Sequence, residues 1–222
     1  NLMRMLPGTE MESEKERNYY GIKTKWRPMD AGWGKYRDEF IFETDENVIS
    51  TNSIKEEEMY NLKKTHFLTN LFWTQGTGKL LLKCGQFFNI NPLDVIMSLS
   101  KDKVSKLSKN ILDPLEKEFK EEWFSTEDDL IKHYKSFENH DKLLSGEEGL
   151  TKLNLKYMAK LMLDKQTAFD AIYLLKKYTK QLCKRDFEVE LFNIVTQISI
   201  DSYRLDLLEG PLSKKIEYTT DY

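Results

Sequence analysis

The sequence predicts a mainly α-helical protein whose small N-terminal part mixes helix and strand. Three observations lead to this prediction. Apolar residues recur at helical spacing through most of the chain after residue 53. Residues that start and stop helices punctuate the same part. Short apolar runs that suit strands are concentrated in residues 1–52. We therefore expect an α+β lead-in over residues 1–52 and a helical C-terminal domain over residues 53–222.

The lead-in opens with a short apolar run, residues 2–6, which a proline–glycine pair ends. We predict a strand there. A single strand leaves its edges and faces without partners in water, so we expect its partners to lie upstream of the given sequence. A charged helix is predicted over residues 10–20, with Thr9 as its N-cap and Gly21 as its stop.

The rest of the lead-in is predicted to be extended. Residues 22–26 alternate apolar and polar side chains, which is typical of a strand with one buried face. Residues 30–34 are predicted to form a loop. Apolar residues 40–42 and 48–49 lie on either side of the polar residues 44–47, which predicts a short hairpin, or two short strands, with a turn at those polar residues.

Helix caps mark the predicted helical domain. Ser53, three residues before a glutamate, has the pattern of a capping box. Asn91 stands before a proline, which suits the first position of a helix because that N–H has no helical partner. Ser125, three residues before an aspartate, predicts a further helix start.

The C-terminal half is predicted to hold three long helices, with apolar stripes at residues 153–162, 168–182 and 187–208. The polar, glycine-containing residues 139–149 before them are the best candidate for a boundary within the helical domain. A short final strand is predicted at residues 216–219.

Charge and composition disfavour some kinds of binding partner and favour one compartment. The chain has a formal net charge of −3, so its overall charge does not favour nucleic acid or an anionic membrane. No apolar run approaches the roughly 20 residues that a membrane-spanning helix needs. The two cysteines, Cys84 and Cys183, suggest buried thiols in a reducing compartment rather than a disulfide scaffold, which favours the cytoplasm.

The sequence contains no phosphate-binding loop, dinucleotide fingerprint or nucleophile-elbow motif. The glycine-rich residues 76–79 are best interpreted as a turn between helices. The three histidines, His66, His133 and His140, are not spaced as metal ligands, so we expect no metal site in this chain. These observations disfavour a stand-alone hydrolase.

One stretch near the N-terminus carries a resemblance. It begins with the run Met-Leu-Pro-Gly-Thr-Glu-Met at residues 5–11 and continues through Arg17 to Tyr-Gly-Ile-Lys-Thr-Lys-Trp-Arg at residues 20–27. Residues 42–43 and 48–57 extend the pattern. In this order the residues resemble the C-terminal region of cobalamin-binding radical-SAM proteins, over roughly residues 3–75.

The resemblance implies a parent polypeptide with a cobalamin domain and a radical-SAM barrel upstream, and residues 2–6 would be the last strand of that barrel. The parent would hold an iron–sulfur cluster, S-adenosylmethionine and cobalamin. This chain lacks the C-x-x-x-C-x-x-C triad and the D-x-H-x-x-G signature, and two cysteines cannot supply three thiolate ligands. We therefore expect none of these cofactors in this chain, which alone would be catalytically silent.

The resemblance also implies candidate site residues. The turn after the first strand would contact the cofactor, because active sites of barrel enzymes gather at the C-terminal ends of strands. The following basic–aromatic segment would contact a small-molecule substrate. The residues concerned are Gly8, Thr9 and Glu10 for the cofactor, and Trp26, Arg27 and Trp33 for the substrate. Simpler structural roles remain open: Glu10 as an acid in a helical first turn, Arg27 in an ion pair near Asp30 or Glu43, and the tryptophans in packing.

The sequence thus favours a C-terminal, substrate-capping part of a cobalamin-dependent radical-SAM enzyme, a class that includes methyltransferases. Its partners would be the upstream domains and the substrate, without nucleic acid or membrane. The alternative is a non-catalytic helical domain that binds a partner protein or serves as a scaffold.

Overall fold

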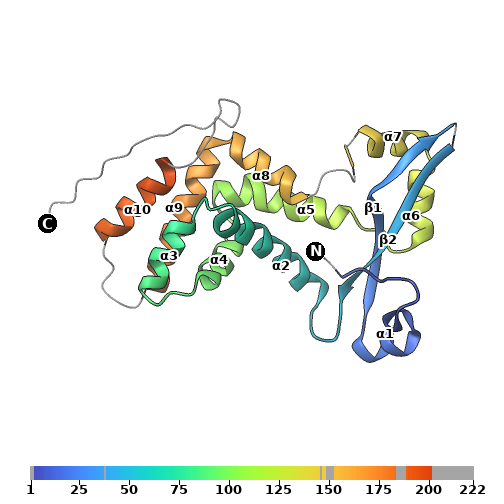
Figure 1. Ribbon diagram of the computed structural model, residues 1–222, viewed down its shortest axis with the longest axis horizontal. Coiled ribbons are helices and arrows are strands. Elements are labelled where there is room, and N and C mark those ends of the chain that lie inside the picture. The colour runs from blue at the N-terminus through green and yellow to red at the C-terminus, as the bar shows by residue number, and fades with distance from the viewer. Residues whose placement is uncertain (1–2, 38, 146, 149–152, 184–188, 202–222) are drawn as a thin grey trace. The chain divides into compact units, whose positions relative to one another are not determined.

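The computed structural model describes residues 3–37, 39–145, 147–148, 153–183 and 189–201. It is mainly helical, with 65% helix, ten α-helices in the described residues, and a small N-terminal antiparallel sheet of three strands (Figure 1). The predicted fold class is confirmed. The predicted C-terminal strand at residues 216–219 and the end of the last predicted helix lie outside the described residues.

The elements follow one another in a simple order. A 3-10 turn, two long strands and a first helix make up the N-terminal part: η1 (Glu10–Glu12), α1 (Glu14–Tyr20), β1 (Lys23–Tyr36) and β2 (Glu39–Ser50). The helices and two π-helical turns that follow are α2 (Glu56–Thr69), η2 (Asn70–Thr74), α3 (Lys79–Phe87), α4 (Pro92–Ser100), η3 (Ser108–Leu112), α5 (Asp113–Glu121), α6 (Glu127–Tyr134), α7 (Phe137–Ser145), α8 (Leu153–Leu163), α9 (Lys165–Leu182) and α10 (Val189–Asp201).

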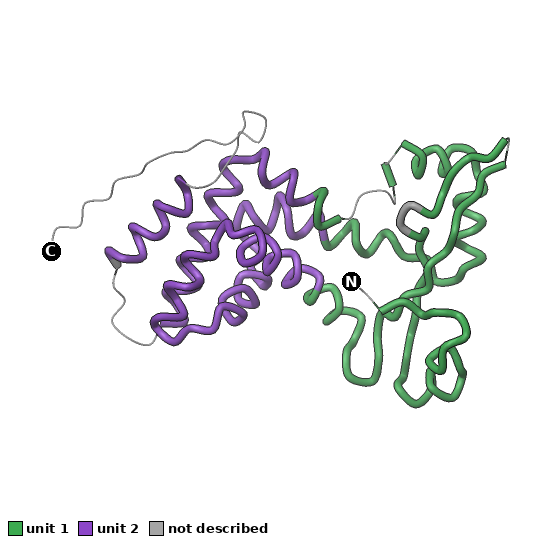
Figure 2. The backbone as a smooth tube through the Cα atoms, in the orientation of Figure 1, with its two compact units in different colours: residues 1–62, 116–156 green, residues 63–115, 157–222 purple. Residues whose placement is uncertain are grey.

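The chain divides into two compact units that are each discontinuous in sequence (Figure 2). Unit 1 consists of residues 1–62 and 116–156, and unit 2 consists of residues 63–115 and 157–222. This division differs from the predicted contiguous one at 52/53, because a segment from the middle of the chain belongs with the N-terminal strands. Residues 137–145, inside the predicted internal boundary, form helix α7.

Strands β1 and β2 form one long antiparallel hairpin in unit 1. Its turn lies between Tyr36 and Glu39, where Arg37 has a φ of 57°. The prediction of a short hairpin turning at residues 44–47 is therefore wrong, since these polar residues lie in the middle of β2. The predicted loop at residues 30–34 is part of β1, where the pairing register shifts between Pro28 and Trp33.

The third strand is the short segment around Arg4, which pairs antiparallel with Asn47. The Met5 amide donates to the Glu46 carbonyl at 2.9 Å, and the Val48 amide donates to the Met3 carbonyl at 2.9 Å. The predicted strand thus exists, but the partner that the structure gives it lies downstream, in β2, rather than upstream of the chain. A local pattern cannot show this pairing, because more than 40 residues separate the two segments.

Two apolar clusters hold unit 1 together. Helices α6 and α7 contribute the buried Leu130, Tyr134 and Leu143, and aromatic side chains of the hairpin pack against them. These aromatic residues are Trp26, Trp33 and Phe42, with Phe124 beside them. A smaller cluster joins Met5, Ile22 and Val48, so the short third strand is anchored by burial as well as by hydrogen bonds.

Several predicted helix boundaries are confirmed and others shift. Gly21 ends α1 in the left-handed conformation, with a φ of 61°, and the Asn91 side chain accepts a hydrogen bond from the Leu93 amide to cap α4. The capping box at Ser53 is not formed, because α2 begins at Glu56 and the Ser53 amide instead donates to the Thr51 hydroxyl.

The other two cap predictions are wrong by a few residues. Thr126, rather than Ser125, caps α6 by accepting from the Asp129 amide. Thr9 precedes only the 3-10 turn, and Ser13 caps α1 by accepting from the Glu16 amide.

Unit 2 is a helical unit with a continuous apolar interior. Its fully buried side chains come from every one of its helical segments, and include Phe67, Phe72, Leu82, Ile111, Ile172 and Phe192. Helix α2 passes into the π-helical turn η2, and η3 leads directly into α5. The three predicted C-terminal helices are confirmed as α8, α9 and α10 within the described residues.

Candidate functional site

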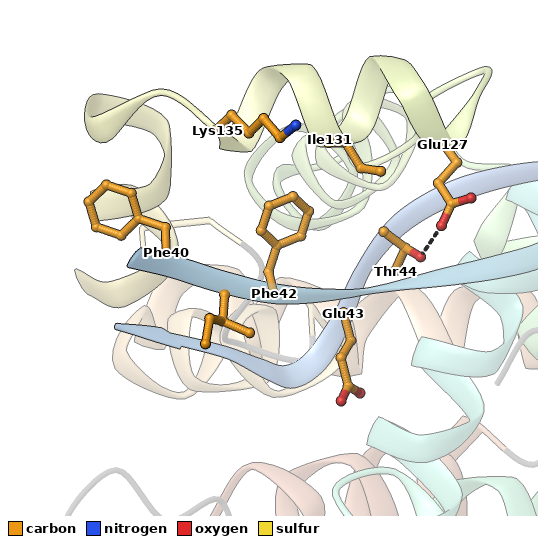
Figure 3. Close-up of a pocket in the computed structure, with 8 residues that line it drawn as sticks. Phe40, Phe42, Glu43, Thr44, Glu127, Ile131 and Lys135 are labelled. Atoms are coloured by element: carbon orange, nitrogen blue, oxygen red, sulfur yellow. Dashed lines mark hydrogen bonds between the residues drawn. The ribbon is translucent and has the colours of Figure 1, made fainter. Parts of the chain in front are cut away.

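A hollow of unit 1 lies between strand β2 and helix α6 (Figure 3). It is open to solvent and has a volume of about 700 Å³, which falls within the range of small-molecule sites. The lining side chains come from residues 40–44 of β2 and from Glu127, Ile131 and Lys135 of α6.

Helix α6 is held against β2 by one polar contact at the end of this pocket. The Thr44 hydroxyl donates to Glu127 Oε1 at 2.5 Å, and Figure 3 shows this bond. Glu127 is the first residue of α6, where a carboxylate also complements the helix dipole. The contact joins residues 83 positions apart in the sequence and fixes that end of the pocket.

The pocket is apolar in its middle and basic at its other end. Phe42 points toward α6 between Ile131 and Lys135 (Figure 3). Phe40 stacks on the fully buried ring of His140, with ring centroids 4.3 Å apart. Lys35 Nζ lies 5.7 Å from the Phe40 ring centroid. Such a site can bind an apolar group, while its lysine end disfavours a cation.

The opposite face of the hairpin carries charged side chains. Arg27 Nε lies 3.6 Å from Asp45 Oδ2, and Arg27 Nη1 lies 3.7 Å from Glu122 Oε2. Its guanidinium carbon lies 5.4 Å from the centroid of the Trp123 ring. Arg4 approaches the same Asp45 oxygen at 3.1 Å. Neither arginine makes a well-directed hydrogen bond to this oxygen, so the contacts are ion pairs with suboptimal geometry.

A tighter charged group joins α1 to the hairpin. Arg17 donates to both carboxylate oxygens of Glu46, at 2.8 and 2.9 Å, and Thr24 donates to Glu46 at 2.5 Å. Burial alone would raise the pKa of Glu46, but the hydrogen bonds from Arg17 and Thr24 outweigh it, and the pKa lies below its ordinary value. The same hydrogen bond to Glu46 raises the pKa of Arg17.

The candidate cofactor residues lie on an exposed turn. Gly8, Thr9 and Glu10 are all exposed, and the Gly8 amide donates to a carboxylate oxygen of Glu12 at 2.6 Å. The Thr9 hydroxyl donates to the Leu6 carbonyl at 2.7 Å. Glu10 stands in the first turn of η1, which agrees with the simpler role of a helical first-turn acid.

The candidate substrate residues do not share one surface. Trp26 and Arg27 are neighbours on β1 and so point to opposite faces of the hairpin. Trp26 and Trp33 pack against the α6–α7 cluster, whereas Arg27 lies among the charged side chains of the other face. Arg27 pairs with Asp45 and Glu122. No ion pair with Glu43 is found among the described residues, and the side chain of Asp30 lies outside them.

No hydrogen bond, ion pair or ring contact within the described parts of the chain joins residues 8–10 to Trp26, Arg27 or Trp33. The six candidates therefore belong to three separate places in unit 1: an exposed turn, an aromatic cluster and a charged face. The alternation of a strand separates the adjacent Trp26 and Arg27, and the sequence could have shown this. The common face of Trp26 and Trp33 depends on the register shift in β1, which the sequence pattern does not show.

The residues of this chain do not fit an iron–sulfur cluster. Cys84 and Cys183 are both half-buried, rather than fully buried as predicted, and neither forms a disulfide in the described structure. Among the described residues, no group of three or more histidine, cysteine, aspartate or glutamate side chains is placed to hold a metal ion.

The pocket between β2 and α6 is the feature that sequence reasoning missed. The sequence predicted residues 40–42 only as an apolar run beside a turn, without a partner from a helix. The one local signal is the apolar triplet at residues 40–42. The α6 side of the pocket comes from residues more than 80 positions later, and no periodicity links the two.

Comparison with known proteins gives no match for this chain, either among protein-family models or among curated proteins. Within the described structure, every helix is too short or too polar to cross a membrane.

Proposed function

We propose that this chain is the C-terminal, substrate-side part of a cobalamin-dependent radical-SAM enzyme. The observation that carries the proposal is the ordered pattern from Met5 to Arg27 followed by residues 42–57. The cluster, S-adenosylmethionine and cobalamin would be bound by other domains of the same polypeptide. The role of this chain would be to cover the substrate and limit its access to water.

The structure of unit 1 agrees with such a role in two respects. The whole pattern up to residue 53 belongs to this unit, so its residues fold together. The open pocket beside the hairpin has the volume of a small-molecule site. Arg27, with about a fifth of its side chain exposed, would be the residue that binds a carboxylate or phosphate of the substrate.

The complete product of the gene, expressed and purified without oxygen, tests the proposal. We expect iron and sulfide in the amounts of one four-iron cluster, bound cobalamin, and cleavage of S-adenosylmethionine after reduction. Gene product free of iron and cobalt, with no cleavage, would overturn the proposal and leave a helical partner-binding or scaffold domain.

Two variants of the gene product test the candidate residues separately. Glu10→Ala should weaken binding of S-adenosylmethionine, measured by equilibrium dialysis, while Glu14→Ala, which removes a nearby exposed acid, should not. Arg27→Lys should raise KM more than it lowers kcat if Arg27 binds the substrate in its ground state. Equal binding of S-adenosylmethionine by both glutamate variants would remove Glu10 from the site.

A further inference from the structure

The outer edge of β2 is paired along only part of its length. Residues 3–5 pair with the stretch around Asn47, through hydrogen bonds to Glu46 and Val48. The chain then reaches Pro7 and Gly8 and turns away into η1. Proline has no N–H to donate, so the third strand cannot continue past this point. Among the described residues, no strand lies beside the rest of this edge.

The uncovered stretch is residues 40–44. Main-chain groups of Glu46 and Val48 point away from β1, and in a strand every second residue does so. Phe42 and Thr44 therefore present their N–H and C=O groups to the same outer edge. Within the described residues, nothing outside the hairpin makes a main-chain hydrogen bond to residues 40–44. Such an edge is a template for another strand.

Two hollows adjoin residues 40–44 of β2. The pocket below α6 includes Ile41 and Glu43 in its lining, and so does a second hollow of about 340 Å³ that is lined by Gly32, Trp33 and Lys35 of β1. The two hollows thus share Ile41 and Glu43 in their linings, and the second extends over the neighbouring strand β1. Half of the Ile41 side chain is exposed there. Peptides that join a sheet edge gain affinity from main-chain hydrogen bonds and specificity from such flanking pockets.

The side chains along this edge indicate which kind of peptide can bind there. Phe40, Phe42 and Thr44 alternate with Glu39, Ile41 and Glu43, so one face is aromatic and the other is acidic around one isoleucine. A second copy of this chain fits poorly: antiparallel pairing centred on Ile41 would place Glu39 opposite Glu43 twice, and like charges directly opposite one another are destabilising.

We propose that residues 40–44 of β2 bind an extended peptide segment of a partner protein, which continues the third strand of the sheet. The segment carries lysine or arginine on the face beside Glu39 and Glu43, and large apolar side chains on the face that enters the pocket of Phe42 and Ile131. Lys135 lines that pocket, and Lys35 Nζ lies 5.7 Å from the ring centroid of Phe40, which also lines it. No ion pair to either lysine is found in the described residues, so the two lysines repel a segment that is basic on both faces. This binding does not depend on the proposed radical-SAM role.

The test uses the 222-residue chain and a capped nine-residue peptide in which lysine and isoleucine alternate. We expect this peptide to bind, measured by fluorescence anisotropy, and to protect the amides of residues 42 and 44 from hydrogen exchange. The same peptide with glutamate in place of lysine should bind at least tenfold more weakly. A lysine peptide with N-methyl groups on the amides that face β2 should not bind, since it cannot form the main-chain hydrogen bonds.

Reversing the charge of two residues at the edge gives a more specific test. In Glu39→Lys with Glu43→Lys, preference should switch to the glutamate peptide, with roughly tenfold changes in each direction. The matched control is Asp94→Lys with Glu190→Lys, which makes the same charge change at exposed residues of unit 2 and should keep the original preference. If the reversed variant does not fold by circular dichroism, Glu39→Gln with Glu43→Gln should bind both peptides equally.

Three outcomes would overturn the proposal. One is a loss of lysine-peptide affinity that is equal in the reversed and control variants, which would indicate attraction to overall charge. The second is binding without protection of residues 42 and 44. The third is a dimer in analytical ultracentrifugation with those amides protected before any peptide is added, which would make a second copy the occupant of the edge.

Discussion

At the scale of single residues, the best-defined interactions of this protein are the charged groups along the hairpin. Arg17 donates two hydrogen bonds to the Glu46 carboxylate, and Thr24 donates a third. Arg27, in contrast, lies 3.6 Å and 3.7 Å from its two acids. A bidentate, partly buried pair contributes more to stability than a loose pair, because both carboxylate oxygens keep a partner after they leave water.

Replacement of Arg17 by alanine should therefore destabilise unit 1. The change leaves Glu46, whose side chain is only 14% exposed, with one hydroxyl partner for its charge. We expect a loss of about 1–2 kcal/mol in the free energy of unfolding, measured by urea denaturation. Lys15→Ala, at an exposed position of the same helix, is the control and should change stability by less than about 0.5 kcal/mol. Equal effects of the two variants would show that the Arg17–Glu46 pair contributes nothing.

The same group predicts a dependence of stability on pH. The pKa of Glu46 is lower in the folded chain than its ordinary value of 4.5, so the unfolded chain binds more protons in acid. Its contribution is complete above pH 4.5 and is lost as the pH falls through the lower, folded pKa. In Glu46→Gln, the free energy of unfolding should fall less steeply below pH 4.5 than in the unaltered chain. Identical slopes in the two proteins would contradict the assignment.

At the scale of elements, close approach between helices limits which residues can occupy the positions where they touch. Gly78 is the N-cap residue of α3, and a Cβ atom there would lie 2.4 Å from Leu175 and 2.8 Å from Phe72. Both neighbours are fully buried, so neither can move into open space. The glycine is required here for the packing of α3 against α9, and not for its backbone conformation.

Gly78→Ala should consequently destabilise unit 2 by about 1–3 kcal/mol through overpacking. Gly34→Ala is the matched control, because the same substitution on β1 meets no atom within 4 Å. We expect the control to stay within about 0.5 kcal/mol of the unaltered chain. Thermal unfolding followed by circular dichroism at 222 nm measures both. A fully stable Gly78→Ala variant would mean that Leu175 or Phe72 can repack at little cost.

At the scale of the whole molecule, the discontinuous units determine how the chain can be divided. The hairpin buries Trp26, Trp33 and Phe42 against helices that come from residues 127–145. An isolated two-stranded hairpin is marginal in water, so residues 1–52 depend on this later segment. A division based on the order of elements would cut through unit 1.

Fragments 1–52 and 53–222 should therefore not both fold alone. We expect fragment 1–52 to show an amide NMR spectrum of an unfolded chain, and to gain dispersed signals when fragment 53–222 is added, because the aromatic cluster can then form. A well-dispersed spectrum of fragment 1–52 by itself would show that the hairpin needs no support from α6 and α7.

The sequence by itself determined the features that depend on neighbouring residues. The mainly helical class follows from the apolar periodicity. The start of α4 follows from the capping side chain of Asn91, and the end of α1 follows from the backbone freedom of Gly21. The predicted capping box at Ser53 was wrong because the Ser53 amide donates to the hydroxyl of Thr51, only two residues away. The sequence pattern does not show which of two nearby acceptors this amide uses.

The tertiary structure alone decided what depends on distant segments. It paired the first strand with β2, made residues 44–47 part of a strand, and brought Glu127 to Thr44 across 83 positions. It also brought Trp26 and Trp33 to the same cluster, because the register of β1 shifts between Pro28 and Trp33. Local signals fix which segments become helix or strand. The burial of their apolar faces, which is non-directional, fixes where those segments meet.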